Sequence, residues 1–140
     1  MENKKATIIV HSGDFDKIMS AFIVGNGFVS MGIPVTMFFT FWGLLALKKN
    51  GFKKASLSKM NLLGLGKFMI NLKMRRYNVA SLDTLAESFK KLGGKIIACT
   101  MTMQLMGLDK KDLRENLVDE YGTVGTYCFT TKDANITLFI

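Results

Sequence analysis

Two residues with chemically active side chains follow short apolar runs that have the composition of buried strands. Cys99 ends the run Lys95–Cys99, and His11, the only histidine, directly follows Ala6–Val10. The aromatic residue Phe41 ends a third such run. Ligands of parallel α/β sheets bind beyond the carboxyl ends of the strands. The pattern therefore indicates a functional site at this edge of a sheet, with the sulfur of Cys99 as its reactive centre.

The residues after Cys99 suggest how its sulfur could be activated. If a helical turn begins at Thr100 and Met101, its free amides and its dipole would lower the pKa of the thiol and favour the thiolate. A thiolate is what attack on a sulfane sulfur donor, or storage of a persulfide, requires. The alternative is a buried cysteine that packs as a small hydrophobic side chain.

The turn after the first apolar run carries further candidates. His11 could act as a general base or hold a substrate anion near Cys99. Alternatively, it caps the strand and bonds a backbone carbonyl. Ser12, Gly13 and Asp14 have the composition of a turn that starts a helix, and we expect Ser12 or Asp14 to accept free helix amides. We expect Asp14 to be a helix cap rather than a catalyst.

The second cysteine, Cys128, lies between Tyr127 and Phe129 with no turn beside it, and we expect it to be a core thiol. Two cysteines 29 positions apart form no CxxC pair, and with one histidine they are too few for a structural zinc site. We expect no metal and no cofactor. The first residues do not read as a secretory signal, so we expect a cytoplasmic protein with free thiols.

The elements that position these residues alternate between strands and helices along the chain. We expect helices from Phe15 to Met31, from Trp42 to Leu47, from the N-cap Ser81 to Leu92, and from Asp109 through about Asn116. We expect strands at Ala6–Val10, Val35–Phe41, Lys95–Cys99 and Asn135–Ile140. The segment Thr123–Thr130 fits a strand by composition but also places apolar residues on one helical face. This order predicts one α/β domain over residues 1–140, with a mostly parallel sheet and helices on both faces.

A long uncharged stretch raises the question whether the protein is soluble or membrane-embedded. There is no charged residue between Lys17 and Lys48, and Phe28–Leu47 is almost long and apolar enough to span a membrane. Glycines and Pro34 interrupt it at Met31–Pro34. A buried helix followed by a strand covered on both faces gives the same apolar run, so we expect a soluble domain. A membrane-embedded hairpin is the alternative.

The basicity of the chain belongs to one segment. Of 19 lysines and arginines, nine lie between Lys48 and Arg76, a stretch without a single acidic residue. We expect residues 48–78 to be a basic, methionine-containing insertion. It could attract an anionic substrate or an acidic protein, lie on a membrane surface, or simply cover an oligomer contact. Nucleic acid is less favoured because few aromatic residues are available for stacking. Neither a Walker motif nor a dinucleotide fingerprint is complete.

Four stretches together resemble the DsrE/DsrF-like family, and specifically the branch often labelled peroxiredoxin-like. These are His11–Lys17, Met37–Gly43, Ala98–Met103 and the closing Ala134–Ile140. The resemblance implies a three-layer sandwich with five strands, assembled as a trimer or larger homo-oligomer. It also implies a persulfide carried on Cys99 and exchanged with TusA-like or rhodanese-like proteins, with no role for Cys128. From the family we further expect a helix near Gly122–Thr131, preceded by a short strand around Leu117–Asp119.

These observations support two functions of different classes. The leading hypothesis is a sulfur-relay protein in which Cys99 accepts sulfane sulfur and passes it to a partner. We predict that its pocket is formed by His11, Ser12, Gly13, Asp14, Thr40, Trp42, Thr100 and Met101. The alternative is a non-enzymatic oligomeric binding module whose basic segment docks to an acidic protein or an anionic membrane, with Cys99 inert. A peroxidase is a weaker third hypothesis, because no arginine lies within a dozen residues of Cys99.

Overall fold

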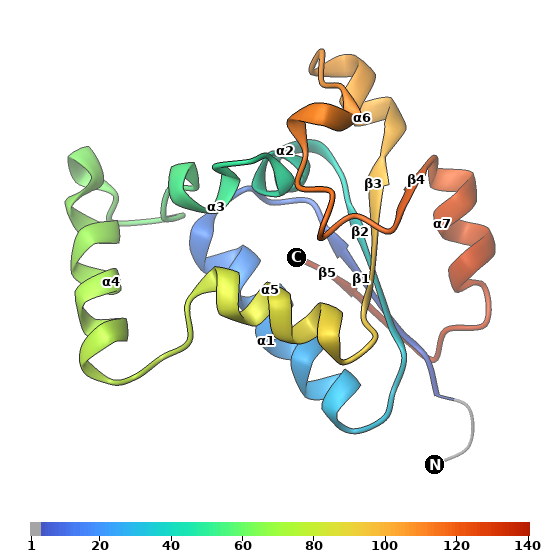
Figure 1. Cartoon of the computed structure of the whole chain (residues 1–140), viewed down its shortest axis with the longest axis horizontal. Coiled ribbons are helices and arrows are strands. Elements are labelled where there is room, and N and C mark those ends of the chain that lie inside the picture. The colour runs from blue at the N-terminus through green and yellow to red at the C-terminus, as the bar shows by residue number, and fades with distance from the viewer. Residues whose placement is uncertain (1–3) are drawn as a thin grey trace.

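Five parallel strands form the centre of the computed structural model, which describes residues 4–140 (Figure 1). The order across the sheet is β4-β3-β2-β1-β5, and each neighbouring pair is parallel. The strands are β1 (Ala6–Val10), β2 (Val35–Phe39), β3 (Lys95–Cys99), β4 (Glu120–Gly122) and β5 (Ile136–Phe139). The predicted fold class is confirmed, and the carboxyl ends of all five strands share one edge.

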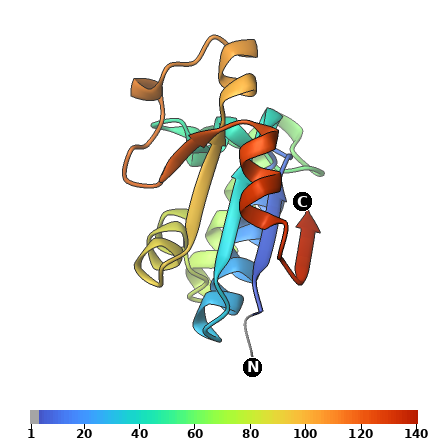
Figure 2. The same ribbon diagram turned by 90° about the vertical axis from the view of Figure 1, so that its right-hand side faces the viewer.

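Helices cover both faces of this sheet, but unequally (Figures 1 and 2). The helices α1 (Phe15–Ser30) and α5 (Leu82–Lys91) cover one face, and α7 (Val124–Thr131) lies on the other. Successive side chains of a strand point to opposite faces. In β3, Ile96 therefore joins the main core, whereas Ile97 joins a much smaller cluster under α7.

The main core is organised around Phe22 of α1. Its ring lies 6.0 Å from that of Phe39 in β2 and 5.9 Å from those of Phe52 and Phe89. This packing explains the long uncharged stretch, because α1 and β2 are buried against each other and against α5. Among residues 4–140, no helix has both the length and the hydropathy needed to cross a membrane.

The remaining helical elements lie in the connections between these layers. They are α2 (Phe41–Leu44), η1 (Leu45–Leu47), α3 (Gly51–Lys54), η2 (Leu62–Gly64), α4 (Leu65–Arg76), α6 (Thr100–Leu105) and η3 (Lys110–Asp112). The segment that we predict to be an insertion supplies α3, η2 and α4. Whereas α3 buries Phe52, α4 buries none of its residues and stands away from the sheet (Figure 1).

Two predicted elements differ in extent from those observed. The strand β2 ends at Phe39 rather than Phe41, because Phe41 adopts a φ of 44° and starts α2. The predicted helix after Asp109 is only the 3-10 turn η3. The side chains of Asp109 and Asp112 cap this turn reciprocally, and the next residue, Leu113, is already extended and bridges to Lys48.

The secondary structure after this turn agrees better with the family-based expectation than with the expectation from composition. Val124–Thr131 is a helix, as the resemblance implies, and Thr123 caps it by accepting the amide of Thr126. The short strand before it is confirmed in kind but wrong in position. It lies at Glu120–Gly122 because Gly122 pairs with Cys99 at the end of β3.

The position of Phe22 predicts a large cost for its truncation. We expect Phe22→Ala to lower the free energy of unfolding by about 3–5 kcal/mol, because it leaves a cavity among packed aromatic rings. Urea denaturation measures this loss. The neighbouring Ile23, which is 51% exposed, provides the control. A loss from Ile23→Ala as large as that from Phe22→Ala would contradict this account of the core.

Candidate functional site

Cys99 occupies the junction between β3 and the helix α6. It is the last residue of the strand and the N-cap residue of the helix, so the condition of a helical turn directly after Cys99 is met. Two buried threonine hydroxyls, those of Thr40 and Thr102, lie 3.1 Å apart beside it. The Thr102 hydroxyl also accepts the amide of Phe41 at 3.1 Å, which fixes its orientation.

The surroundings of Cys99 favour its ionised form. Burial by itself raises the pKa of this thiol. Hydrogen bonds from the hydroxyl and amide of Thr102, the hydroxyl of Thr40 and the amide of Met101 outweigh that effect and lower the pKa below its ordinary value. Helix amides and hydroxyls that point at a sulfur stabilise the thiolate, which is the nucleophilic form.

Cys99 is nevertheless completely covered in this structure, with 0% of its surface exposed. Its side chain packs with Phe38, Ile97 and Tyr127 on the α7 face of the sheet. The sulfur that we expected to be the reactive centre at this edge of the sheet is therefore buried, as in the alternative of a packed cysteine. The physical reason is the pleat of β3, which points Cys99 toward Tyr127 rather than out of the edge. The reactive role of Cys99 stays a prediction.

The expectation for Cys128 is wrong, because its thiol is exposed and free. The preceding residue, Tyr127, is the inward-facing residue of α7, and its hydroxyl lies 2.9 Å from that of Thr7. Successive helical residues are rotated by about 100°. The side chain of Cys128 is thereby turned away from the sheet.

Aromatic rings gather beyond the ends of β1, β2 and β5. The ring of His11 lies 5.2 Å from that of Phe41 and 5.5 Å from that of Phe139. No hydrogen bond among residues 4–140 joins His11 to Cys99. The positive φ of Phe41 is a strained conformation for a side chain of this size, and such strain is often found at functional sites.

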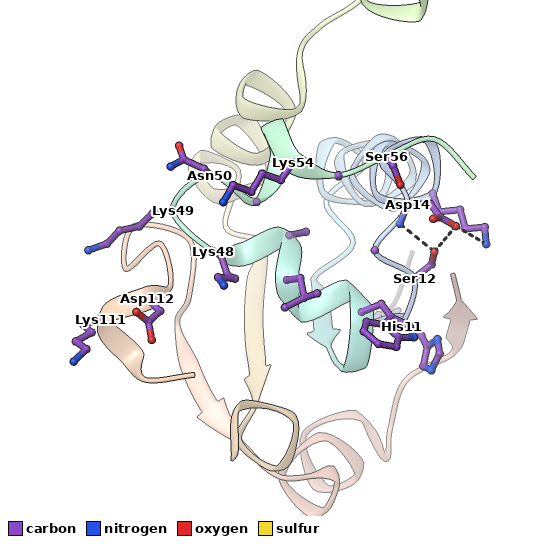
Figure 3. Close-up of a pocket in the computed structure, with 17 residues that line it drawn as sticks. His11, Ser12, Asp14, Lys48, Lys49, Asn50, Lys54, Ser56, Lys111 and Asp112 are labelled. Atoms are coloured by element: carbon purple, nitrogen blue, oxygen red, sulfur yellow. Dashed lines mark hydrogen bonds and ion pairs between the residues drawn. The ribbon is translucent and has the colours of Figure 1, made fainter. Parts of the chain in front are cut away.

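A cavity of about 800 Å³ is lined in part by His11 (Figure 3). It brings together five of the predicted pocket residues, which are His11, Ser12, Gly13, Asp14 and Trp42. Thr40, Thr100 and Met101 do not line it. The residues predicted to form one pocket therefore do not share one cavity. The structure has a cavity beside His11 and a separate, closed environment around Cys99.

The turn at the cavity rim is held by a small polar network (Figure 3). The Ser12 hydroxyl donates to the carboxylate of Asp14 at 3.0 Å and accepts the Asp14 amide at 3.2 Å. Lys17 forms an ion pair with the same carboxylate at 3.0 Å. Asp14 is the N-cap residue of α1, but its side chain accepts no capping hydrogen bond, so its predicted capping role is wrong.

Of the residues predicted near the sulfur, Met101 contributes its amide and Thr40 its hydroxyl. The hydroxyl of Thr100 instead donates to the carbonyl of Gly122 at 3.3 Å. The sequence analysis missed Thr102, although its position three residues after an N-cap is the usual one for a capping interaction. It also missed the lysines of the cavity. Among residues 4–140, no three histidine, cysteine or acidic side chains come together as a metal would require.

Sequence comparison identifies known proteins that are similar to this chain. A sequence profile of the DsrE/DsrF/DrsH-like family matches residues 2–56 and 50–139. The chain is 37% identical over 159 aligned residues to the uncharacterized protein YrkE of Bacillus subtilis (strain 168), covering 99% of this chain and 98% of the relative. It is 28% identical over 161 aligned residues to the sulfur carrier protein DsrE2 of Allochromatium vinosum, covering 100% of both.

Two solved structures share the fold at low sequence identity. The protein of unknown function MTH1491 from Methanobacterium thermoautotrophicum superposes with a TM-score of 0.62 at 10% identity. The ychN protein from E. coli superposes with a TM-score of 0.61 at 12% identity. Each alignment covers 98% of this chain and 99% of the other.

The hydrogen bonds to Cys99 predict the effect of removing one of them. We expect Thr102→Val to raise the pKa of Cys99 and so to reduce its thiolate fraction at neutral pH. The pH midpoint of iodoacetamide alkylation, followed on the Cys99 peptide by mass spectrometry in a Cys128→Ser background, measures this shift. Thr100→Val is the matched control, because the Thr100 hydroxyl bonds Gly122. An unchanged midpoint in Thr102→Val would contradict the assignment.

Proposed function

The chain belongs to the DsrE/DsrF/DrsH-like family, and from this premise we propose that it is a sulfur-relay protein that carries sulfane sulfur as a persulfide on Cys99. The observation that carries the proposal is the position of Cys99 as the last residue of β3 and the N-cap residue of α6, beside the paired hydroxyls of Thr40 and Thr102. These hydroxyls and the first amides of α6 lower the pKa of the Cys99 thiol below its ordinary value, although burial opposes this. Similarity over the full length to a protein named as a sulfur carrier supports it. Cys128, which has no comparable surroundings, is not assigned a role.

The proposed transfer is a pair of nucleophilic displacements. The Cys99 thiolate attacks the outer sulfur of a donor persulfide, forming a new S–S bond while the donor's own S–S bond breaks. The donor leaves as a thiolate with the electron pair of that bond, and any proton on the transferred sulfur stays on that sulfur. An acceptor thiolate then attacks that outer sulfur and releases the Cys99 thiolate. A lowered pKa makes Cys99 a better leaving group in this second step.

Because the sulfur is covered, exchange requires the cover to move. Tyr127 of α7 belongs to the buried cluster that contains Cys99, and its hydroxyl contact with Thr7 holds it there. The cluster under α7 has only four buried members, Phe38, Ile97, Cys99 and Tyr127, so little apolar area opposes displacement of this helix. We propose that a partner protein exposes Cys99 by displacing α7, which would protect the persulfide between transfers.

We extend the proposal to the protein's partners, its assembly and its location in the cell. We propose that the donor and acceptor are TusA-like or rhodanese-like proteins, that the protein is a cytoplasmic homo-oligomer, and that it forms a trimer or larger assembly. Exposed apolar side chains on α7, the helix that packs over the face of Cys99, support such contacts, among them Val124 and Phe129. Exposed apolar residues that lie close together are typical of protein interfaces.

The helix α4 favours a second candidate function, that of a non-enzymatic binding module. Its exposed apolar residues Leu65, Phe68, Met69 and Leu72 share one helix with four cations. This combination suits an acidic protein or an anionic membrane surface. One of the cations, Lys67, is instead turned to the body of the molecule, where its ammonium donates to the carbonyls of Phe52 and Lys53.

The sulfur-relay proposal predicts where a transferred sulfur is found. After incubation with a persulfide donor, we expect intact mass spectrometry to show a protein one sulfur atom heavier. The adduct should persist in Cys128→Ser and disappear in Cys99→Ser. Cys128→Ser is a stringent control because Cys128 is the more exposed thiol. An adduct that survives Cys99→Ser but is lost in Cys128→Ser would overturn the assignment.

The binding-module candidate predicts a charge-dependent association through α4. If it is correct, Lys73→Gln/Arg75→Gln/Arg76→Gln should abolish cosedimentation with phosphatidylserine-containing vesicles or binding of an acidic partner. Lys67 is left unchanged because it anchors the helix. The control removes three exposed charges elsewhere, at Lys91, Lys95 and Lys132. Equal binding of both triple variants, together with a reactive Cys99, would eliminate this candidate.

A further inference from the structure

The cavity beside His11 carries a strong excess of positive charge. Five lysines line it, against two carboxylates, Asp14 and Asp112. The lysines come from three separate parts of the chain: Lys17 from α1, Lys48, Lys49 and Lys54 from the stretch around α3, and Lys111 from η3. Figure 3 shows Lys48 and Lys54 between the Ser12–Asp14 turn on one side and Lys49 and Lys111 on the other.

The two carboxylates neutralise only part of this charge. Asp14 is already occupied by Lys17 and by the Ser12 hydroxyl. Asp112 accepts the amide of Asp109 at 2.8 Å as part of a capping box. Within residues 4–140, no ion pair involves Lys48, Lys49 or Lys54. Like charges that line one cavity without counter-charges raise the electrostatic energy of the free protein, and an anion bound in the cavity lowers it.

The walls of the cavity are tied together by the backbone. The amide of Phe15, at the start of α1, donates to the carbonyl of Ser56 at 2.7 Å, and the amide of Lys49 donates to the carbonyl of Asp112 at 3.2 Å. At Gly13, an added Cβ would lie 2.6 Å from the carbonyl oxygen of Trp42, so these segments are in close contact. Most ligand cavities are formed in this way before the ligand arrives.

We propose that this cavity binds an organic diphosphate of the nucleoside diphosphate type. Three unpaired ammonium groups suit the several negative charges of a diphosphate, which lysine binds as a point charge. A cavity of about 800 Å³ exceeds what a diphosphate alone fills, which leaves space for an organic group. Trp42, which is 60% exposed at the cavity, offers an aromatic face against which a planar ring can stack. The contacts come from lysine side chains, so no glycine-rich phosphate motif is required.

Trp42 is the only tryptophan of the chain, so its fluorescence reports on this cavity directly. We expect a saturable change on titration with ADP at fixed ionic strength, confirmed by isothermal titration calorimetry. Binding of AMP and of inorganic diphosphate should be weaker, because each lacks one half of the recognised group. We expect Lys48→Gln/Lys49→Gln/Lys54→Gln to weaken ADP binding at least about tenfold, since charge-assisted hydrogen bonds are lost.

Three controls make this test decisive. Lys73→Gln/Arg75→Gln/Arg76→Gln removes the same number of charges from α4 and should leave ADP binding within about twofold, because screened charges outside the cavity contribute little. Cys99→Ser should bind ADP normally, which separates this inference from the sulfur-relay proposal. Circular dichroism melting verifies that both triple variants are folded.

Several outcomes would overturn the inference. No saturable ADP binding by either method would reject the site. Equal losses in the two triple variants would show that the attraction comes from the net charge of the protein rather than from the cavity. Inorganic diphosphate binding as tightly as ADP would reject the organic part of the ligand.

Discussion

Parallel pairing of all five strands brings their carboxyl ends to one edge of the sheet, and the position of each candidate group depends on this constraint. His11 follows β1, Phe41 follows β2 and Cys99 ends β3, so three groups far apart in sequence lie along a single rim. Such pairing is stable only when both faces of the sheet are covered. The burial of α1 and β2 against each other is therefore what makes the rim possible.

The pleat of the strands then separates Cys99 from the lysine-lined cavity at this rim. Alternate residues of β3 point to opposite faces, so Ala98 faces the main core while Cys99 faces α7. The lysine-lined cavity instead forms among the start of α1, the short helices after β2 and the turn η3. A sulfur site and an anion site can consequently share one edge of the sheet without sharing side chains.

The environment of Cys99 combines two properties that usually oppose each other. Burial disfavours a thiolate, but the Thr40 and Thr102 hydroxyls and the first amides of α6 more than compensate for the loss of water. The result is a sulfur that is activated and shielded at once. This combination is consistent with the proposed carrier role, because a thiolate shielded from solvent is also shielded from adventitious thiols.

The sequence by itself determined the elements whose signals are local. The strands at Ala6–Val10 and Lys95–Cys99 follow from their short β-branched and apolar runs, and the Ser81 cap follows from its hydroxyl. Only the tertiary structure decided which cysteine is exposed. The helical rotation of α7 turns Cys128 outward, and the pleat of β3 turns Cys99 into the buried cluster that contains Tyr127.

The cavity could likewise not be read from the chain. Lys17, Lys54 and Lys111 are distant in sequence, and each alone looks like an ordinary surface charge. Their convergence depends on backbone hydrogen bonds such as that from Lys49 to Asp112, which join segments with no local preference for each other. Local propensity acts over a few neighbouring residues, whereas burial and charge at a site depend on segments that only folding brings together.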